Sequence, residues 1–251
     1  MVNNLETFPG DELQIYRGRD YTLAPGITIH QPTLDEICDY GECAYWSMIY
    51  TLTSTGADLK FQLDDMGIDY TQISDFQLFY SLLAPSCDQS KTYIITGDLD
   101  FTNCQLMQNK SSEEIVMYDA AQGILIDQQT YLKFAQILRN IHGLKRNAQL
   151  PANEATKRIL IEDAREEYER GKDKPYISQL KNLVSAMINC PGFKYDHSQV
   201  WNMKINAFLD SVKRISKIKN ADLLLQSGYS GFGINLKEIP DKQLNWMGEL
   251  D

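Results

Sequence analysis

Histidine and cysteine are scarce in this 251-residue sequence, which has three of the first and five of the second. His30, His142 and His197 fall in different predicted elements and form no metal-binding spacing such as H-E-x-x-H. The cysteines are odd in number and scattered, which favours small, buried, reduced thiols over a disulfide framework. Cys38 and Cys43 are five apart on a predicted helix, so they cannot easily share a zinc ion. We therefore expect no metal and no cofactor.

Signals for membrane insertion, secretion and nucleotide binding are also missing. No run of about 18 apolar residues occurs. The first six residues, MVNNLE, have neither a basic start nor an apolar core. The sequence has no G-x-x-x-x-G-K-[ST] loop, and GYSGFG at 228–233 lacks the preceding strand of a dinucleotide-binding fingerprint. These absences predict a soluble intracellular protein without a membrane contact.

Basic residues are outnumbered, because 24 Lys and Arg face 34 Asp and Glu, for a formal net charge of −10. That balance argues against nonspecific binding of nucleic acid by the whole molecule. Residues 1–127 have a net charge of −15 and residues 128–251 a net charge of +5. The asymmetry predicts an acidic and a basic face or, alternatively, two halves that intermingle in space.

The hydrophobic content of 43% is enough to build a core, and its periodicity predicts an α+β fold. We expect it to be mostly helical, with a small N-terminal β-meander and a second short β region in the middle. The expected strands are 13–16, 21–23, 27–30, 93–95, 105–107, 115–118 and 124–126, with a hairpin turn at 119–123. The expected helices are 33–55, 57–66, 74–83, 127–142, 153–171, 175–189 and 196–227.

Several helix ends have explicit signals. Thr33 and Glu36 match a capping box, Asp127 is an N-cap and Gly143 is a C-terminal stop. His142 lies in a last turn, where a cation favours the helix dipole. The polar stretch 145–153 predicts a boundary. It divides an acidic α+β region, 1–147, from a helical region, 148–251, with a long amphipathic helix and a C-terminal tail.

The longest predicted helix combines an apolar stripe with basic residues. The stripe is heptad-like and consists of Trp201, Ile205, Phe208, Val212 and Ile215. The basic run 212–219 could contact phosphate, but aromatic residues do not interleave it. The favoured interpretation is that this helix docks against an acidic partner surface. The N-terminal half of this chain is one candidate for that surface. The stripe fits either a homo-oligomer seam or internal packing.

Catalytic chemistry is weakly supported by the residues. The acidic pairs Asp35/Glu36, Asp39/Glu42 and Asp64/Asp65 could hold Mg²⁺, but paired carboxylates on a helix usually form a solvated face. Cys–His catalysis would need distant residues to meet, and nothing in the sequence requires this. The residues therefore predict a protein that is not an enzyme and that acts through interaction surfaces.

Two stretches of the chain resemble a known family. The first comprises ITIHQPTLDEI at 27–37, YGE at 40–42, YWSMIYTLT at 45–53, MGIDY at 66–70 and SDFQLF at 74–79. The second comprises NAFLDSVKRI at 206–215, YSG at 229–231 and LNWM at 244–247. Together they resemble tail assembly chaperone-like proteins from the tail-morphogenesis modules of long-tailed phages and prophages of Gram-positive bacteria.

The resemblance implies a non-enzymatic assembly factor in the host cytoplasm. Such chaperones bind the tape-measure protein, and tail-tube subunits then polymerise around it. A helix-in-groove contact would suit an aggregation-prone helical partner. We predict partner binding near Trp46, Tyr50, Trp201 and Phe208, with core packing as the alternative for each aromatic ring.

Three other functions stay open. The first is a structural virion protein of the tail or connector, which would remain in finished particles. The second is an acidic inhibitor of a host nucleic-acid-handling protein, for which the charge of residues 1–127 is the reason. The third is an enzyme with an unfamiliar site.

Overall fold

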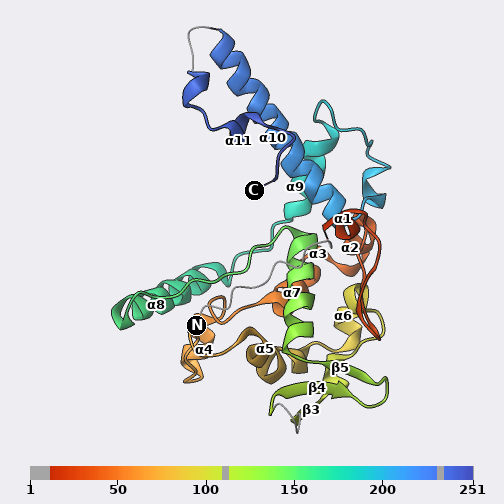
Figure 1. The fold of residues 1–251 in the computed structure, drawn as a ribbon, viewed down its shortest axis with the longest axis vertical. Helices are drawn as coiled ribbons and strands as arrows, with labels where there is room; N and C mark the ends of the chain where they lie inside the picture. The colour runs from red at the N-terminus through yellow and green to blue at the C-terminus, as the bar shows by residue number, and fades with distance from the viewer. Residues whose placement is uncertain (1–11, 109–112, 231–234, 251) are drawn as a thin grey trace.

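The computed structural model describes residues 12–108, 113–230 and 235–250. It has an α+β fold, mostly helical, with one small antiparallel sheet near the N-terminus and another in the middle (Figure 1). The predicted fold class is confirmed. The α-helices are α1 Glu12–Tyr16, α2 Leu34–Tyr40, α3 Glu42–Thr53, α4 Lys60–Asp65, α5 Asp75–Leu78, α6 Gln89–Thr96, α7 Gln128–His142, α8 Glu154–Gly171, α9 Gln179–Ile188, α10 Ile205–Tyr229 and α11 Asp241–Leu244. The strands are β1 Tyr21–Ala24, β2 Ile27–Ile29, β3 Gln105–Gln108, β4 Ile115–Asp119 and β5 Ile124–Ile126. The short helical turns are η1 Phe79–Leu83, η2 Ala84–Ser86, η3 Phe101–Asn103, η4 Val200–Asn202 and η5 Leu236–Glu238.

Both sheets are built from local antiparallel pairs. β1 pairs with β2, and β4 lies between β3 and β5. In the turn at 119–123, the Asp119 carboxylate accepts the backbone N–H of Ala121 at 2.8 Å. Gly123 has a φ of +67°, in the region that favours glycine. The predicted hairpin is therefore confirmed.

α7 is the central helix of the fold (Figure 1). The Asp127 carboxylate accepts the Thr130 N–H at 2.8 Å, and Gly143 ends the helix at a φ of +62°, as predicted. α7 contacts α1, α3, α5, α10, β1 and β5. Its buried apolar residues are Tyr131, Phe134, Ala135, Ile137, Leu138 and Ile141. The main core is therefore organised around this helix.

The main core draws on residues from both sides of the predicted boundary. Ile37, Tyr45 and Phe134 share one cluster of buried side chains with Val184 and Phe208. The division into 1–147 and 148–251 stays a prediction.

Carboxylates of the acidic first half form ion pairs with cations of the basic second half. The pairs are Asp65–Arg165 at 2.8 Å, Asp69–Lys157 at 2.7 Å and Asp75–Arg146 at 2.8 Å. These contacts agree with the alternative in which the two charged halves intermingle.

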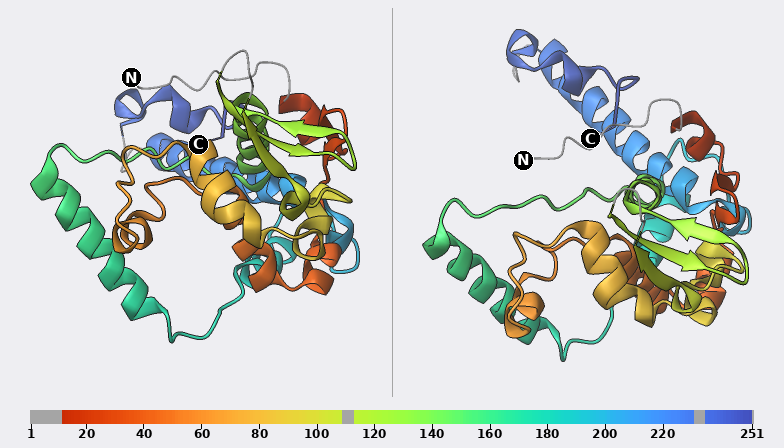
Figure 2. Two further views of the ribbon diagram at one scale, coloured as in Figure 1. Left: turned by 90° about the horizontal axis from the view of Figure 1, so that it is seen from below. Right: turned by 60° about the horizontal axis from the view of Figure 1, so that its bottom comes forward.

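Two long helices, α8 and α10, project from this packed body (Figures 1 and 2). α8 packs beside α4, and its Ile161 joins a second, smaller core with Leu63 and Leu78. α10 buries Ile205 and Phe208 at its start, while most of its later residues stay partly or fully exposed. Residues 235–250 fold back along α10, since α11 and η5 both contact it.

Two predicted strands, 13–16 and 93–95, are helical. Residues 13–16 belong to α1, in which Ile15 is buried. Residues 93–95 belong to α6, where the buried residues Thr92, Ile95 and Thr96 lie on one helix face. A run of three or four apolar residues does not distinguish a strand from a short buried helix, and tertiary packing decides.

Several predicted helix boundaries are wrong. Gly41, at a φ of +96°, splits the expected helix 33–55 into α2 and α3. α9 begins at Gln179 rather than at 175, because the Ser178 hydroxyl accepts the Lys181 N–H at 3.0 Å and caps the helix there.

The longest helix begins at Ile205, nine residues later than predicted. Trp201 lies in η4, so it is not the first member of the α10 stripe. Residues 231–233 of the predicted Gly-rich turn lie outside the described residues.

The expectation of five buried thiols is wrong for Cys38 and Cys43, which are exposed. They lie on the solvent side of α2 and α3. Cys87 is buried, and burial raises the pKa of its thiol to about 11.

His142 does not act as a cation at the end of α7. Burial lowers its pKa to about 4, so it is neutral at pH 7. Its Nδ1 lies 2.7 Å from the Leu138 carbonyl, and its Nε2 lies 2.5 Å from the Tyr45 hydroxyl. A neutral imidazole that donates from Nδ1 and accepts at Nε2 satisfies both contacts.

Candidate binding groove

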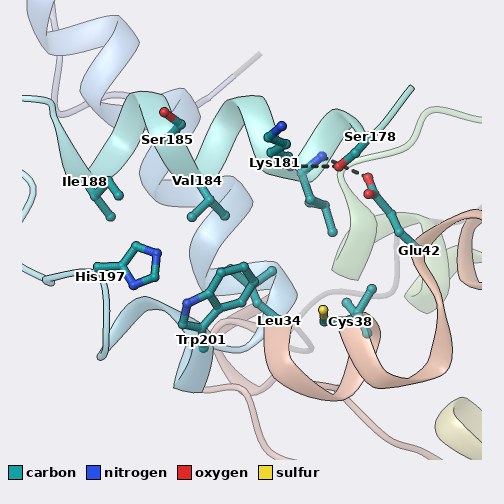
Figure 3. Close-up of a pocket in the computed structure, with 12 residues that line it drawn as sticks. Leu34, Cys38, Glu42, Ser178, Lys181, Val184, Ser185, Ile188, His197 and Trp201 are labelled. Atoms are coloured by element: carbon teal, nitrogen blue, oxygen red, sulfur yellow. Dashed lines mark hydrogen bonds between the residues drawn. The ribbon is translucent and has the colours of Figure 1, made fainter. Parts of the chain in front are cut away.

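A cavity of about 470 Å³ opens between α2, α9 and η4 (Figure 3). Its floor is apolar and its rim holds hydroxyl, thiol, amine and imidazole groups. The lining residues are Leu34, Ile37, Cys38, Glu42, Ser178, Leu180, Lys181, Val184, Ser185, Ile188, His197 and Trp201. We call this cavity the α2–α9 groove.

A capping box sets the α2 wall in place, as predicted. The Thr33 N–H donates to the Glu36 carboxylate at 2.6 Å, and the Glu36 N–H donates to the Thr33 hydroxyl at 3.2 Å. With its first turn fixed, α2 buries Leu34 and Ile37 and leaves Cys38 exposed beside them. One side of α2 thus belongs both to the core and to the groove.

Glu42 fastens the α9 wall to the start of α3. Its Oε1 accepts the backbone N–H groups of Gln179 at 3.0 Å and Leu180 at 2.9 Å. Burial acts to raise the pKa of Glu42, but hydrogen bonds from Leu180, Ser178, Tyr176 and Gln179 outweigh it and hold the pKa below its usual value. A carboxylate at a helix N-terminus satisfies unpaired amides and complements the helix dipole.

The third wall is held by backbone hydrogen bonds. The Leu34 N–H donates to the Met203 carbonyl, and the Ile205 N–H donates to the Pro32 carbonyl, both at 3.0 Å. These bonds place η4 against the start of α2. The Trp201 ring then faces Val184 across the groove (Figure 3), with the His197 ring edge-on to it at a centroid distance of 6.1 Å.

The groove is suited to holding apolar groups. Leu180 and Val184 are buried in its floor, whereas Lys181 and Ser185 stand exposed on its rim. Clefts of about 300–1,000 Å³ with an apolar lining and few polar groups are typical ligand sites. Among the described residues, no group of three or more His, Cys, Asp or Glu side chains could hold a metal ion.

The structure separates the four predicted partner-binding aromatics. Trp201 lines the groove. Trp46 is half-buried, its ring lies 6.2 Å from that of Tyr50, and Tyr50 is 50% exposed. Phe208 is 0% exposed. The expectation of an exposed face at Phe208 is therefore wrong, because its ring fills the core between α7 and α10.

An exposed aromatic patch borders the groove on the far side of Glu42. Tyr176 is 47% exposed and Ile177 is 74% exposed. Burial, a hydrogen bond to Glu42 and the nearby acidic groups Glu42, Cys43 and Tyr50 raise the pKa of Tyr176 to about 12. Tyr50 and Tyr176 therefore lie close together, next to the residue that fastens α9.

Sequence reasoning missed the residues that build the α9 wall. Leu180, Val184 and Met187 are buried at helical spacing, so their periodicity was available. The role of Glu42 could not be predicted from the sequence, because it depends on a contact with Gln179, which lies 137 positions along the chain.

A second cavity, of about 350 Å³, is lined by 55–57, 70, 71, 73–76, 128, 132 and 146–150. Its wall contains the Asp75–Arg146 pair, with two hydrogen bonds of 2.8 and 2.9 Å. The hydrogen bond to Asp75 raises the pKa of Arg146. The two hydrogen bonds pair the Arg146 guanidinium with the Asp75 carboxylate, so this pair has a structural role and does not indicate a ligand site.

None of the helices in the described ranges combines the length and hydropathy needed to cross a membrane. A comparison with protein-family models, with curated proteins and with solved structures finds no match to this chain.

Proposed function

We propose that this protein is a non-enzymatic binding protein that holds an apolar helix of a partner in the α2–α9 groove. The observation that supports the proposal is the groove itself. It has an apolar floor formed by two helices, a polar rim, and an exposed aromatic patch at its border. Binding of an amphipathic helix in a groove uses this combination of surfaces.

The specific form of the proposal is a tail assembly chaperone that binds the phage tape-measure protein in the host cytoplasm. Its support is the resemblance of 27–53 and 206–215, since α2, α3 and the start of α10 come from these residues. A tape measure presents apolar helical stripes, and a chaperone must cover them reversibly. A net charge of −10 helps keep such a complex in solution.

Reversible binding is consistent with the size of the groove. A few apolar anchors that enter it would each contribute about 1.5–3 kcal/mol, offset by the cost of association. Trp201 in its lining and Tyr50 and Tyr176 at its border are suited to anchoring, because aromatic residues dominate interface energetics. The tail-tube protein is a further partner in this proposal.

Filling the groove tests the proposal. Ser185→Phe places a ring on the rim at an exposed position that lines the groove. Asn182→Phe is the matched control, because it adds the same ring to an exposed position of α9 that does not line the groove. Each chain is co-expressed with the tape-measure protein of the same tail module, and the captured tape measure is quantified.

We expect wild type and Asn182→Phe to capture the tape measure equally and Ser185→Phe to capture at least tenfold less. Equal capture by all three chains would contradict the groove as the binding site. No capture by wild type would contradict the tape measure as partner.

A structural virion protein is the second candidate, and particle composition separates the two. A chaperone is abundant in lysate and absent from purified particles of the same culture. A fixed copy number in particles, measured by quantitative mass spectrometry, would overturn the chaperone proposal.

A further inference from the structure

The projecting part of α10 has a second surface, separate from the groove. Lys213, Arg214 and Lys217 lie along this part of the helix, and residues 235–250 fold back against it (Figure 1). We call this surface the α10 basic face and the segment 235–250 the tail. Between them lies a cavity of about 610 Å³, lined in part by Val212, Ser216 and Leu250.

The basic face holds the tail by its backbone. Arg214 Nη1 donates to the carbonyl oxygens of Trp246 at 2.6 Å and Gly248 at 2.7 Å. Lys217 donates to the carbonyl oxygen of Glu249. Within the described residues, no carboxylate forms an ion pair with Arg214 or Lys217. Their positive charges are thus met by neutral acceptors.

Apolar packing between the tail and α10 is sparse. α11 buries no residue, and the side chains of Trp246 and Met247 are 43% and 73% exposed. In α10 beyond Phe208, only Ala221 is buried among the described residues. Polar contacts with exposed partners contribute little to stability compared with buried apolar area. The tail is therefore lightly held.

One close contact does join the tail to the helix. A Cβ atom at Gly228 would lie 2.2 Å from Leu236 Cγ, so glycine lets Leu236 rest on the helix backbone. A side chain at this position would push the tail away. Gly171 in α8 has no atom within 4 Å of such a Cβ and offers a matched control.

We propose that the α10 basic face is a docking surface for an acidic segment of a partner protein, and that the tail is its displaceable internal occupant. A carboxylate accepts hydrogen bonds from guanidinium and ammonium groups more strongly than a carbonyl does. A partner that offers carboxylates to Arg214 and Lys217 therefore gains more than the tail supplies. The tethered tail competes as a ligand at an effective concentration on the order of 1 mM.

The test uses the full chain and two labelled peptides. One peptide has the sequence of residues 240–250, and the other has the same sequence with Met247→Glu, which adds a carboxylate between Trp246 and Gly248, whose carbonyls Arg214 binds. Their affinities are measured for wild type, Gly228→Ala and Gly171→Ala at low and high salt.

We expect Gly228→Ala to bind the native peptide at least tenfold more tightly than wild type and Gly171→Ala to match wild type. The Met247→Glu peptide should bind more tightly than the native one, and less so at high salt. Equal affinities of wild type and Gly228→Ala for both peptides would overturn the proposal.

A second readout does not depend on the glycine variants. Saturating Met247→Glu peptide should speed hydrogen exchange at the tail amides of Asn245 and Gly248, which are hydrogen-bonded within the tail. Exchange in α7 should stay unchanged. Unchanged exchange at the tail would contradict its displacement. Ser185→Phe should not alter peptide binding, so failure here is distinguishable from failure of the groove.

Discussion

The two projecting helices, α8 and α10, are both long and amphipathic, yet their charges are met in different ways. On α8, Arg165 forms hydrogen bonds of 2.8 and 3.0 Å to the Asp65 carboxylate, and Lys157 lies 2.7 Å from Asp69. On α10, Arg214 contacts only carbonyl oxygens of the tail among the described residues. The fold thus pairs Lys157 and Arg165 of α8 with carboxylates, whereas Arg214 of α10 meets only neutral acceptors.

Apolar exposure does not separate the two helices in the same way. Tyr168 of α8 packs on Phe61 at a centroid distance of 5.2 Å, and Arg165 lies over the same ring at 5.6 Å. Both helices also expose an apolar side chain, Ile159 of α8 at 61% and Leu223 of α10 at 66%. Cations that are paired with carboxylates of the fold stabilise the fold, whereas cations that meet only neutral acceptors are available to an acidic partner.

The largest expected effect distinguishes the base of α10 from its outer half. Phe208→Ala removes a fully buried ring and should lower the free energy of unfolding by about 3–5 kcal/mol. Leu223→Ala changes an exposed side chain and should cost less than about 0.5 kcal/mol. Urea denaturation measures both. Similar losses for the two variants would show that the outer half is packed as tightly as the base.

Acid should loosen α8 before it affects the tail. A hydrogen bond from Lys157, with the Thr71 amide and hydroxyl, lowers the pKa of Asp69 from 3.8 to about 2. The stabilisation from this depressed pKa is present above pH 3.8 and is lost as pH falls towards 2. The tail contacts use carbonyl acceptors that do not titrate.

Hydrogen exchange measures this loosening at low pH. Its rates, corrected for intrinsic pH dependence, should rise in α4 and α8 between pH 4 and 2. Asp69→Asn should reduce that pH dependence. An equal acid-induced rise of the exchange rates in the tail would contradict the difference proposed between α8 and α10.

The smallest effect concerns two matched arginine variants. Arg165→Gln and Arg214→Gln each remove one partly exposed guanidinium, and global unfolding should change little in either. Local exchange should differ, with Arg165→Gln faster in α4 and α8 and Arg214→Gln faster at 241–248. Changes at both places in either variant would mean that the two helices are coupled.

Local signals in the sequence predicted much of the fold. The caps at Thr33 and Asp127, the stop at Gly143 and the hairpin at 119–123 all depend on residues within a few positions, and all are present. The short runs 13–16 and 93–95 were mispredicted, because burial against distant elements made them helical.

The groove was less accessible to sequence reasoning. Of the four predicted aromatics, Trp201 lines it and Phe208 is buried beneath the surface. The contacts that assemble it join Glu42 to 179–180 and 32–34 to 203–205. Pairings at such separations leave no periodic pattern in one sequence. The basic run was expected to dock against an acidic surface, with the N-terminal half of this chain as one candidate, whereas Arg214 and Lys217 contact the tail.

The most direct measurement is hydrogen exchange of the chain with and without a helical segment of the tape-measure protein. The account predicts slower exchange in α2 and α9, at 34–40 and 179–188, and no change in α8. Protection confined to α8, or none at saturating segment, would contradict the α2–α9 groove as the site where this protein binds its partner.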